Sequence, residues 1–503
     1  MDIRIIALSS AFLIARHHTL DVESIKFIFI DFPIVKIILL AGCVYFNFNC
    51  LRRDRFSDLL KYSLFLCVTP YVYIQFFHAM LMSSVVVIKK LWRSESSFNE
   101  HNSTIKFVVI LILYGFLITL LGQAREINLL AYPFFIITFF SSFSAFFVAI
   151  KIEQEDCFEI IRFLRNLAIS VFIAISYSHW ILGIEGWDNL TGGTINAHHA
   201  AFLLSVLALY NIVYLRINQQ HFNMLLSLII IGMIFYYMYI TDSKAHIISI
   251  FSGLFSVILI RLWYAGSVTN RIGKIAFFYL LGPVLIASVW FGSGFIPISK
   301  IRHDDVRAII SQHIFSYDSA RTFILLDWWS QLREEPLISI MGRGPGTFLS
   351  KAGISRAFDI LSKYEQDLTL GTKQEVQSKL PSFIPPFSSS DFRKFAYPKI
   401  FFKKGDDITW TSSLVAFLWE YGLIGFCILS LLFWQQFKQG VVLSFIDNKR
   451  LAFIGFLSAA LTVAFFLNAG YRGFLEVPYN MFILYALWGM SSQLSTRMGN
   501  PEE

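Results

Sequence analysis

The sequence predicts an all-α polytopic membrane protein with about 12 transmembrane helices and one long outer loop that itself contains helices. Only 15% of the 503 residues are charged, against roughly 25% in ordinary soluble domains, while 56% are hydrophobic and the mean hydropathy is +0.60. Apolar runs of 18 to 27 residues recur from Ile25 to Met490, and each is long enough to cross a hydrocarbon core of about 30 Å. These observations exclude a soluble enzyme, a single-anchor receptor and an outer-membrane barrel, whose strands alternate with period two.

The expected spans follow the apolar runs in order. Before a long polar gap they lie near residues 25–47, 62–88, 105–122, 128–150, 165–184, 197–217, 222–240, 245–264 and 273–292, and after it near 411–434, 451–468 and 474–492. The first 15 residues are apolar but lack a small-residue cleavage site, so we expect an anchor or a short span there. No internal repeat is visible, which gives no support to an inverted-repeat transporter.

Lysine and arginine in the short loops predict the orientation, because cytoplasmic loops retain positive charge. One set of alternate loops is basic and is assigned to the cytoplasm: Lys89, Lys90, Arg93, Lys106, Lys151, Arg162, Arg165, Arg216, Arg261, Arg271, Lys274, Lys438, Lys449 and Arg450. The opposite set of loops holds fewer basic residues. The exception is one group, Arg52, Arg53, Arg55 and Lys61, which the alternation places on the wrong side. Either the Pro70-containing segment 62–88 does not cross simply, or the first 15 residues span the membrane.

This orientation divides the chain into three parts. An N-terminal transmembrane bundle covers 1–292, a large outer loop covers 293–410, and C-terminal transmembrane helices with a short cytoplasmic tail cover 411–503. The loop holds 16 Lys+Arg and 13 Asp+Glu in 118 residues, and a loop of this length is usually functional. Apolar residues at helical spacing predict an amphipathic helix over 319–332, followed by Pro336.

The outer loop also carries a pattern suited to phosphate. Arg321 opens the segment RTFILLDWW, and the glycine-rich turn Gly342-Arg343-Gly344-Pro345-Gly346 follows it. An arginine beside a turn with free backbone N–H groups can hold a phosphate or diphosphate. A nucleotide phosphate loop is excluded, since no Gly-Lys-Ser/Thr follows. The alternative, a tight turn with a solvated arginine, stays open.

Two other expected spans carry further candidate residues. Lys244 heads a span on the outer side, where it is either a partner for an anionic lipid-linked substrate or an interface anchor. Glu420 lies about ten residues into another span, where a carboxylate needs a partner or water. Arg472 or Lys244 is a candidate partner, and a neutral glutamic acid hydrogen-bonded between helices is the other possibility.

These stretches, in this order around one long outer loop, resemble the O-antigen ligase and O-antigen/exopolysaccharide polymerase superfamily over residues 190–430. The family pattern is a Ser-Arg pair opening a span, an arginine-to-Trp helix with a Gly-x-Gly-Pro-Gly-like turn, and a span reading Glu-x-Gly-x-x-Gly. Here Ser243-Lys244 replaces the Ser-Arg pair, which keeps the charge but loses the guanidinium fork. Trp410-Thr411-Ser412 lacks the histidine that ligases place before the Glu-x-Gly span, which favours polymerase.

The resemblance implies a C-type glycosyltransferase architecture in a bacterial inner membrane, with its active site facing the periplasm. The implied catalytic residues are Arg321, Lys244, His199 and Glu420, and the implied substrate-binding residues are Arg343, Gly344, Gly346, His198, Asp327, Arg472 and Arg302. His198, His199 or His303 is a candidate general base. We expect no metal, because His303 and the adjacent Asp304 and Asp305 cannot easily converge on one ion, and no cofactor.

The favoured function is polymerisation of O-antigen or a related surface polysaccharide from undecaprenyl-diphosphate-linked oligosaccharides. A ligase, which transfers the glycan to lipid A core, is the first alternative. A polysaccharide flippase or other transporter is the second, although transporters tend to keep their loops short. The expected partners are the lipid-linked donor, an acceptor glycan, membrane lipids, and a chain-length regulator and flippase, with no nucleic acid.

Overall fold

The structure is a computed structural model of the chain. It describes residues 33–69, 71–93, 102–121, 132–133, 136–137, 140–184, 190, 194, 197–217, 221–240, 243–264, 328, 332–345, 413–471 and 478–499. The elements in this part are α2 (Pro33–Arg53), α3 (Phe56–Cys67), α4 (Val72–Arg93), α5 (Asn102–Leu121), η2 (Ser141–Phe143), α7 (Ser144–Ala149), α8 (Gln154–Trp180), α9 (Ala197–Ile217), α10 (His221–Ile240), α11 (Lys244–Tyr264), α15 (Pro336–Met341), α19 (Ser413–Leu443), α20 (Lys449–Tyr471) and α21 (Pro478–Gly499).

The predicted all-α class is confirmed for the described residues, among which no strand occurs. Four helices in this part are long and apolar enough to cross a membrane: Val72–Lys89, Ser103–Leu121, Ser413–Leu443 and Lys449–Gly470. Shorter apolar helices lie within α9, α10 and α11. The protein is therefore a membrane protein, while the expected total of about 12 spans stays a prediction.

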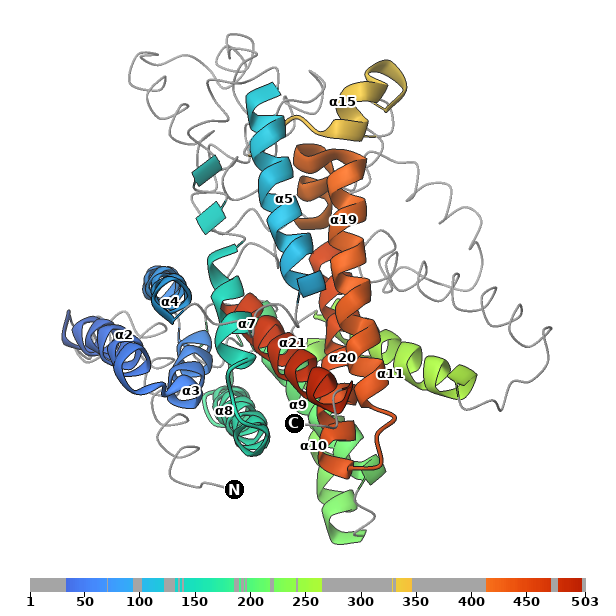
Figure 1. Cartoon of the computed structure of the whole chain (residues 1–503). Helices are drawn as coiled ribbons and strands as arrows, with labels where there is room; N and C mark the ends of the chain where they lie inside the picture. Colours follow the sequence, from blue (N-terminus) through green and yellow to red (C-terminus); the bar gives the residue numbers. More distant parts are fainter. Residues whose placement is uncertain are drawn as a thin grey trace, which may run out of the picture.

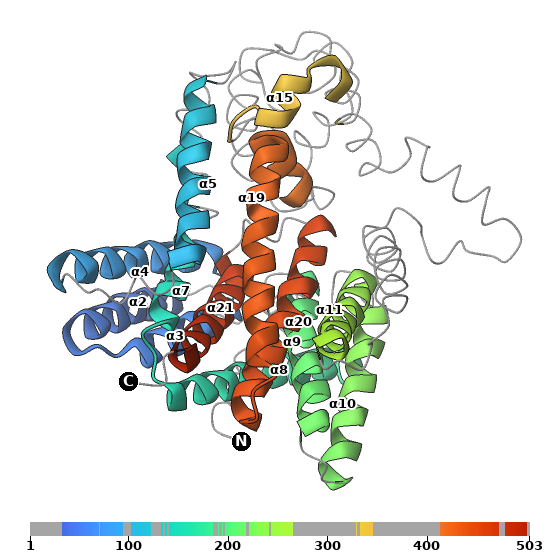
Figure 2. The same ribbon diagram turned by 45° about the vertical axis from the view of Figure 1, so that its right-hand side comes forward.

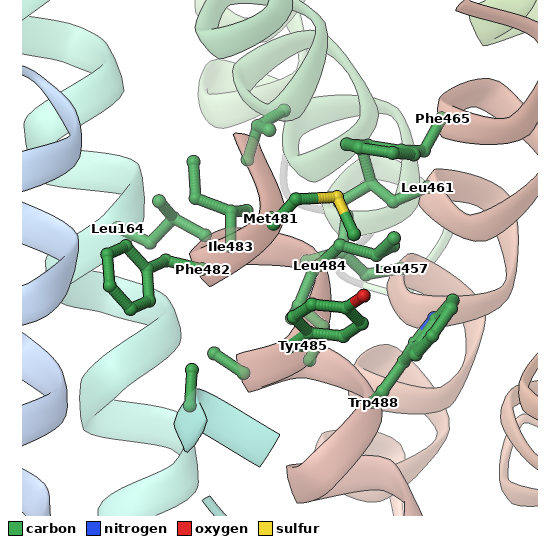
Figure 3. Close-up of a cluster of buried hydrophobic side chains, with 14 of the residues drawn as sticks. Leu164, Leu457, Leu461, Phe465, Met481, Phe482, Ile483, Leu484, Tyr485 and Trp488 are labelled. Carbon is green, nitrogen blue, oxygen red and sulfur yellow. The ribbon is translucent and has the colours of Figure 1, made fainter. Parts of the chain in front are cut away.

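The core forms around α20 and α21. Helix α20 packs between α19 and α11, and α21 packs against α7 and α19. Figure 3 shows Phe482 of α21 lying near Leu164 of α8, while Met481 points toward Leu461 and Leu457 of α20. Buried Trp488 of α21 satisfies its polar atom in this apolar setting, since its Nε1 donates to Thr462 Oγ1 at 2.8 Å.

Glycines allow α19 and α20 to pack closely together. This is common between membrane helices, because in lipid the hydrophobic effect does not drive helices together and close packing has to do so. A Cβ on Gly440 of α19 would lie 2.9 Å from the backbone nitrogen of Ala459, and a Cβ on Gly455 of α20 would lie 2.6 Å from Gly440 O. Helices α19 and α20 therefore pack antiparallel with their backbones almost in contact. The start of α20 consequently lies beside the end of α19.

The predicted span 62–88 is confirmed only in its second part, since the helix that could cross a membrane begins at Val72. The chain instead forms α3 and α4, which are joined at residues 68–71 and run antiparallel: Gln75 Nε2 donates to Leu66 O at 2.8 Å and Ser63 Oγ lies 2.8 Å from His78 Nε2. Helix α3 has only 12 residues, too few to cross a bilayer at 1.5 Å per residue. This break agrees with the alternative in which segment 62–88 does not cross simply, while the first 15 residues, on which the other alternative depends, lie outside the described residues.

This hairpin also explains why the alternation of loops placed Arg52, Arg53, Arg55 and Lys61 on the wrong side. Lys89 at the end of α4 pairs with Asp54 at the start of the hairpin, and Lys61 pairs with Glu159 of α8 at 3.0 Å. Residues 52–61 therefore share one end of the molecule with Lys89 and the start of α8, both of which belong to the basic set of loops.

The remaining expected spans have mixed outcomes. Helices α9, α10 and α11 agree with the expected 197–217, 222–240 and 245–264 to within one residue at each end. Helix α8 begins at Gln154 rather than near residue 165, because hydropathy marks only the apolar part of a helix whose first turns are charged. The expected span 273–292 lies outside the described residues.

Candidate functional site

Two motif stretches that lie 78 residues apart in sequence meet in the structure. Helix α19 is interrupted at Gly422, whose φ of 65° and ψ of −174° are non-helical, so carbonyl groups just before it lose their ordinary helical donors. The turn after α15 supplies replacements: Arg343 N–H donates to Trp419 O at 3.2 Å, and Gly344 N–H donates to Glu420 O at 2.9 Å. We call residues 341–344 and 419–422 the glycine joint.

The glycine joint depends on two residues without side chains. Gly342 has a φ of 93°, and a Cβ there would lie 2.5 Å from Glu420 O and from the carbonyl carbon of Tyr421. A Cβ on Gly422 would in turn collide with the backbone nitrogen of Gly342. In Figures 1 and 2 the joint lies where the turn after α15 meets the first part of α19. The two segments thus fit together backbone against backbone.

Helix α5 completes the joint. Tyr114 OH donates to Met341 O at 2.6 Å, and the ring of buried Tyr421 lies directly against Gly115. The Tyr421 ring also stacks on Phe417 with centroids 4.3 Å apart. Three elements from distant parts of the chain therefore fix the position of the glycine-rich turn.

The prediction of free backbone donors in this turn is wrong for its described residues. Gly342 N–H donates to Ile338 O at 2.6 Å, and the N–H groups of Arg343 and Gly344 donate to α19. A buried backbone N–H is nearly always satisfied within the protein, and here the broken helix is the acceptor. Gly344 therefore serves as part of the joint and does not offer its N–H to a diphosphate, while Gly346 lies outside the described residues.

The Arg343 side chain is held at the edge of the joint. Its Nη2 donates to Glu335 Oε2 at 2.7 Å, and its guanidinium carbon lies 5.9 Å from the centre of the Trp419 ring. The arginine side chain is 16% exposed and the glutamate side chain 45% exposed. The guanidinium is thus mostly buried and held in one orientation, with a partly exposed carboxylate as its neighbour.

Glu420 is fully buried in α19, seven residues after the helix begins, as its place in an apolar span predicts. Its backbone carbonyl is part of the glycine joint. The candidate partners Arg472 and the Lys244 side chain lie outside the described residues, so the pairing of Glu420 stays a prediction.

A second group of buried polar residues lies at the start of α9 and α11 and the end of α20. His199 and His246 are both buried and close enough to interact electrostatically, and Ser249 Oγ donates to Asn468 Oδ1 at 3.2 Å. Gly470, two residues after Asn468, lies next to Leu414 at the start of α19, at 3.6 Å from an added Cβ. This polar group and the glycine joint thus share one end of the α19–α20 pair.

His246 was not predicted from the sequence as a site residue. A signal for it exists in the sequence, because polar residues recur every three or four positions just before and along α11, and all of them are buried: Ser243, His246, Ser249, Ser252 and Ser256. Such a stripe on an apolar helix indicates a face turned toward other helices.

The other candidate residues are placed less fully. Lys244 is the first residue of α11 and His198 the second of α9, but their side chains are outside the described residues. Arg321, Asp327, Arg302 and Arg472 lie wholly outside them, so their roles stay predictions. Within the described part of the chain, no group of three or more His, Cys, Asp or Glu residues is placed to hold a metal ion.

The fold and the joint define a class of protein, an all-helical membrane protein in which a loop turn is locked onto a broken membrane helix. No protein-family model matches the chain, and a search of curated proteins finds no significant match.

Proposed function

We propose that this protein is a polymerase of O-antigen or a related surface polysaccharide. It would join undecaprenyl-diphosphate-linked oligosaccharide repeats at the periplasmic face of a bacterial inner membrane. One observation carries the proposal: the glycine joint holds the glycine-rich turn of the long loop against the Glu-x-Gly kink of α19. These are two of the three sequence stretches that resemble the polymerase and ligase superfamily.

The proposed reaction uses one general base and three cations. The acceptor hydroxyl oxygen attacks the anomeric carbon of the donor sugar as the C–O bond to the diphosphate breaks, with inversion. His199 takes the hydroxyl proton, and undecaprenyl diphosphate leaves with the bonding electron pair. Lys244, Arg321 and Arg343 stabilise the negative charge that develops on the leaving group, so no cofactor is required.

Of these three cations, Arg343 is the one whose side chain the structure describes. Its guanidinium is already oriented by Trp419 and paired with Glu335, so binding a diphosphate requires that the Glu335 carboxylate be displaced or shared. A diphosphate carries more charge than one carboxylate and accepts bidentate hydrogen bonds from the same fork. Arg343 would therefore hold the donor once the diphosphate replaces or shares the Glu335 carboxylate.

A deletion strain provides the test. In cells that lack this gene, the lipopolysaccharide ladder should collapse to core bearing a single repeat, and a plasmid copy should restore it. Bare core with polymer accumulating on the lipid carrier would instead indicate a ligase. An unchanged ladder would contradict both O-antigen functions.

A single substitution then separates an enzyme from a transporter. Arg321→Ala should abolish polymer at an unchanged protein level, because the variant loses a cation at the leaving diphosphate. Arg333→Ala, in the same loop and exposed, is the matched control and should leave the ladder intact. Polymer retained in Arg321→Ala would remove this residue from the mechanism.

A further inference from the structure

Three arginines gather at the end of the molecule opposite the glycine joint. Arg162 and Arg165 lie on α8, and Arg450 is the second residue of α20. Because α19 and α20 are antiparallel, the start of α20 lies far from the kinked start of α19. Figures 1 and 2 show α8 and α15 toward opposite ends of the molecule. We call Arg162, Arg165 and Arg450 the arginine cluster.

Two members of the arginine cluster share one aromatic ring. The guanidinium carbons of Arg162 and Arg450 lie 4.7 Å and 5.4 Å from the centre of the Phe158 ring. The two positive charges are therefore separated by no more than the sum of these distances. Such proximity of like charges is unfavourable unless an anion lies nearby. The ring lowers this cost only partly, through cation–π attraction.

The third arginine is oriented by neutral groups. Arg165 donates from Nε and Nη2 to Asn166 Oδ1, at 3.4 Å and 3.0 Å, and from Nη1 to Tyr210 OH at 3.4 Å. These bonds fix the guanidinium without compensating its charge. Its carbon also lies 5.3 Å from the centre of the Tyr210 ring.

The arginine cluster has no anionic partner among the described residues. There, no carboxylate oxygen lies within 4 Å of any of its three guanidiniums. Glu159, one turn before Arg162, is already paired with Lys61 at 3.0 Å. Arg162 and Arg450 are exposed, so an external anion can reach them.

The surroundings of the arginine cluster are aromatic. The rings of Phe158, Phe453, Tyr210 and Tyr214 follow one another with centroids 6.3, 4.9 and 6.2 Å apart. Charged forks at one end of an apolar helical bundle suit an anion that carries its own apolar chains, because basic pockets between membrane helices bind lipid head groups.

We propose that Arg162, Arg165 and Arg450 form a binding site for a phosphate group, supplied by the head group of an anionic phospholipid. The planar guanidinium groups match the geometry of phosphate oxygens. Three of them together can balance the negative charge of the phosphate. The site stands apart from the proposed polymerase reaction and does not depend on it.

Native mass spectrometry of the full chain in neutral detergent tests this site. Phosphatidylglycerol is titrated as the probe, with phosphatidylcholine as the zwitterionic comparison. Arg162→Gln and Arg450→Gln should each weaken phosphatidylglycerol binding about tenfold, the scale of one lost charged hydrogen bond. Arg55→Gln is the matched control, because Arg55 is also exposed but lies 3.7 Å from the Asp58 carboxylate; it should leave the affinity unchanged.

Further arms identify the source of the phosphate and the role of the fork. Arg165→Lys keeps the charge but removes the fork, so it should also weaken phosphatidylglycerol binding. Inorganic phosphate at millimolar concentration should fail to displace the lipid. If it displaces the lipid from the wild-type protein, the ligand is the free ion, and the lipid assignment is overturned. Equal affinity in wild type, Arg162→Gln and Arg450→Gln would overturn the site itself. Both glutamine variants alter exposed side chains, and an unchanged thermal midpoint without lipid verifies that they fold.

Discussion

Gly342 and Gly422 both adopt positive φ angles, of 93° and 65°, at a point where two backbones touch. Alanine at either position should destabilise the protein by about 1–3 kcal/mol from backbone strain alone, and the clash of the new methyl group with the facing backbone adds to this. Tryptophan fluorescence during heating of the purified protein measures the effect as a lower thermal midpoint.

Gly232→Ala is the matched control for these two variants. Gly232 lies in the middle of α10, and a Cβ there would meet nothing within 4 Å. The alanine variant should therefore be unchanged or more stable, by up to about 1 kcal/mol, because alanine favours helix over glycine. If Gly422→Ala were as stable as Gly232→Ala, the glycine joint would not be required for the fold.

Glu335 offers a second test at the level of single residues, one that rests on the proposed function. Its ion pair with Arg343 is partly exposed, so Glu335→Gln should change stability by less than about 1 kcal/mol. Removing the carboxylate frees Arg343 for the donor diphosphate, so the KM for lipid-linked donor should fall. Glu334→Gln, at the neighbouring exposed position, is the control. A raised KM in Glu335→Gln would mean that Glu335 assists donor binding.

Among the helices, the α3–α4 hairpin is held by a buried polar group. His78 is fully buried, with Nε2 at 2.8 Å from Ser63 Oγ and Nδ1 at 3.2 Å from Asn47 Nδ2. Ser63→Ala should cost about 0.6 kcal/mol, the average measured for hydrogen bonds between membrane helices, and at most about 1.7 kcal/mol. Thermal unfolding in detergent gives the value.

Ser178→Ala is the control for the hairpin prediction. Ser178 is equally buried, but the hydrogen bond from its hydroxyl goes to Ala174 O within its own helix. Its loss should be smaller than that of Ser63→Ala, since no contact between helices is broken. Equal thermal midpoints for the two variants would show that the Ser63–His78 contact does not stabilise the hairpin.

Helix bounds could be predicted wherever an apolar run ends at polar residues, as α9, α10 and α11 show. The break between α3 and α4 could not, because averaging hydropathy over a window hides a short turn inside a continuous apolar run. Pro70 marked the place, but proline is also tolerated within membrane helices. The break is visible only in tertiary contacts, because the contacts of His78 with Ser63 and of Gln75 with Leu66 require α4 to turn back along α3.

Across the whole molecule, the motif residues could be identified in the sequence, but the contacts that they make could not be predicted from it. The glycine-rich turn was predicted to offer free N–H groups, and nothing in its sequence shows that the broken α19 accepts them. Glycine at Gly342 and Gly422 is compatible with both roles. Only the contact between segments 78 residues apart separates a phosphate loop from a joint.

The arrangement of helix ends gives a final prediction, about orientation. The pairs Lys89–Asp54 and Lys61–Glu159 place residues 52–61 with the basic loops, so Arg55 should face the cytoplasm together with Lys449. Glu335, beside the glycine joint at the other end of α19, should face outward. Single cysteines at these three exposed positions, in a Cys427→Ser background because Cys427 is the exposed one of the five native cysteines, can be labelled with a membrane-impermeant maleimide.

In right-side-out vesicles, the cysteine at position 335 should react and those at 55 and 449 should not, and inside-out vesicles should reverse the pattern. Lysing the vesicles with detergent controls for reactivity, since all three positions should then label. Labelling of 55 and 449 from opposite sides would contradict the hairpin account of the basic group. Labelling of all three from one side would place the glycine joint and the arginine cluster on the same face, and the proposed outward reaction would lose its support.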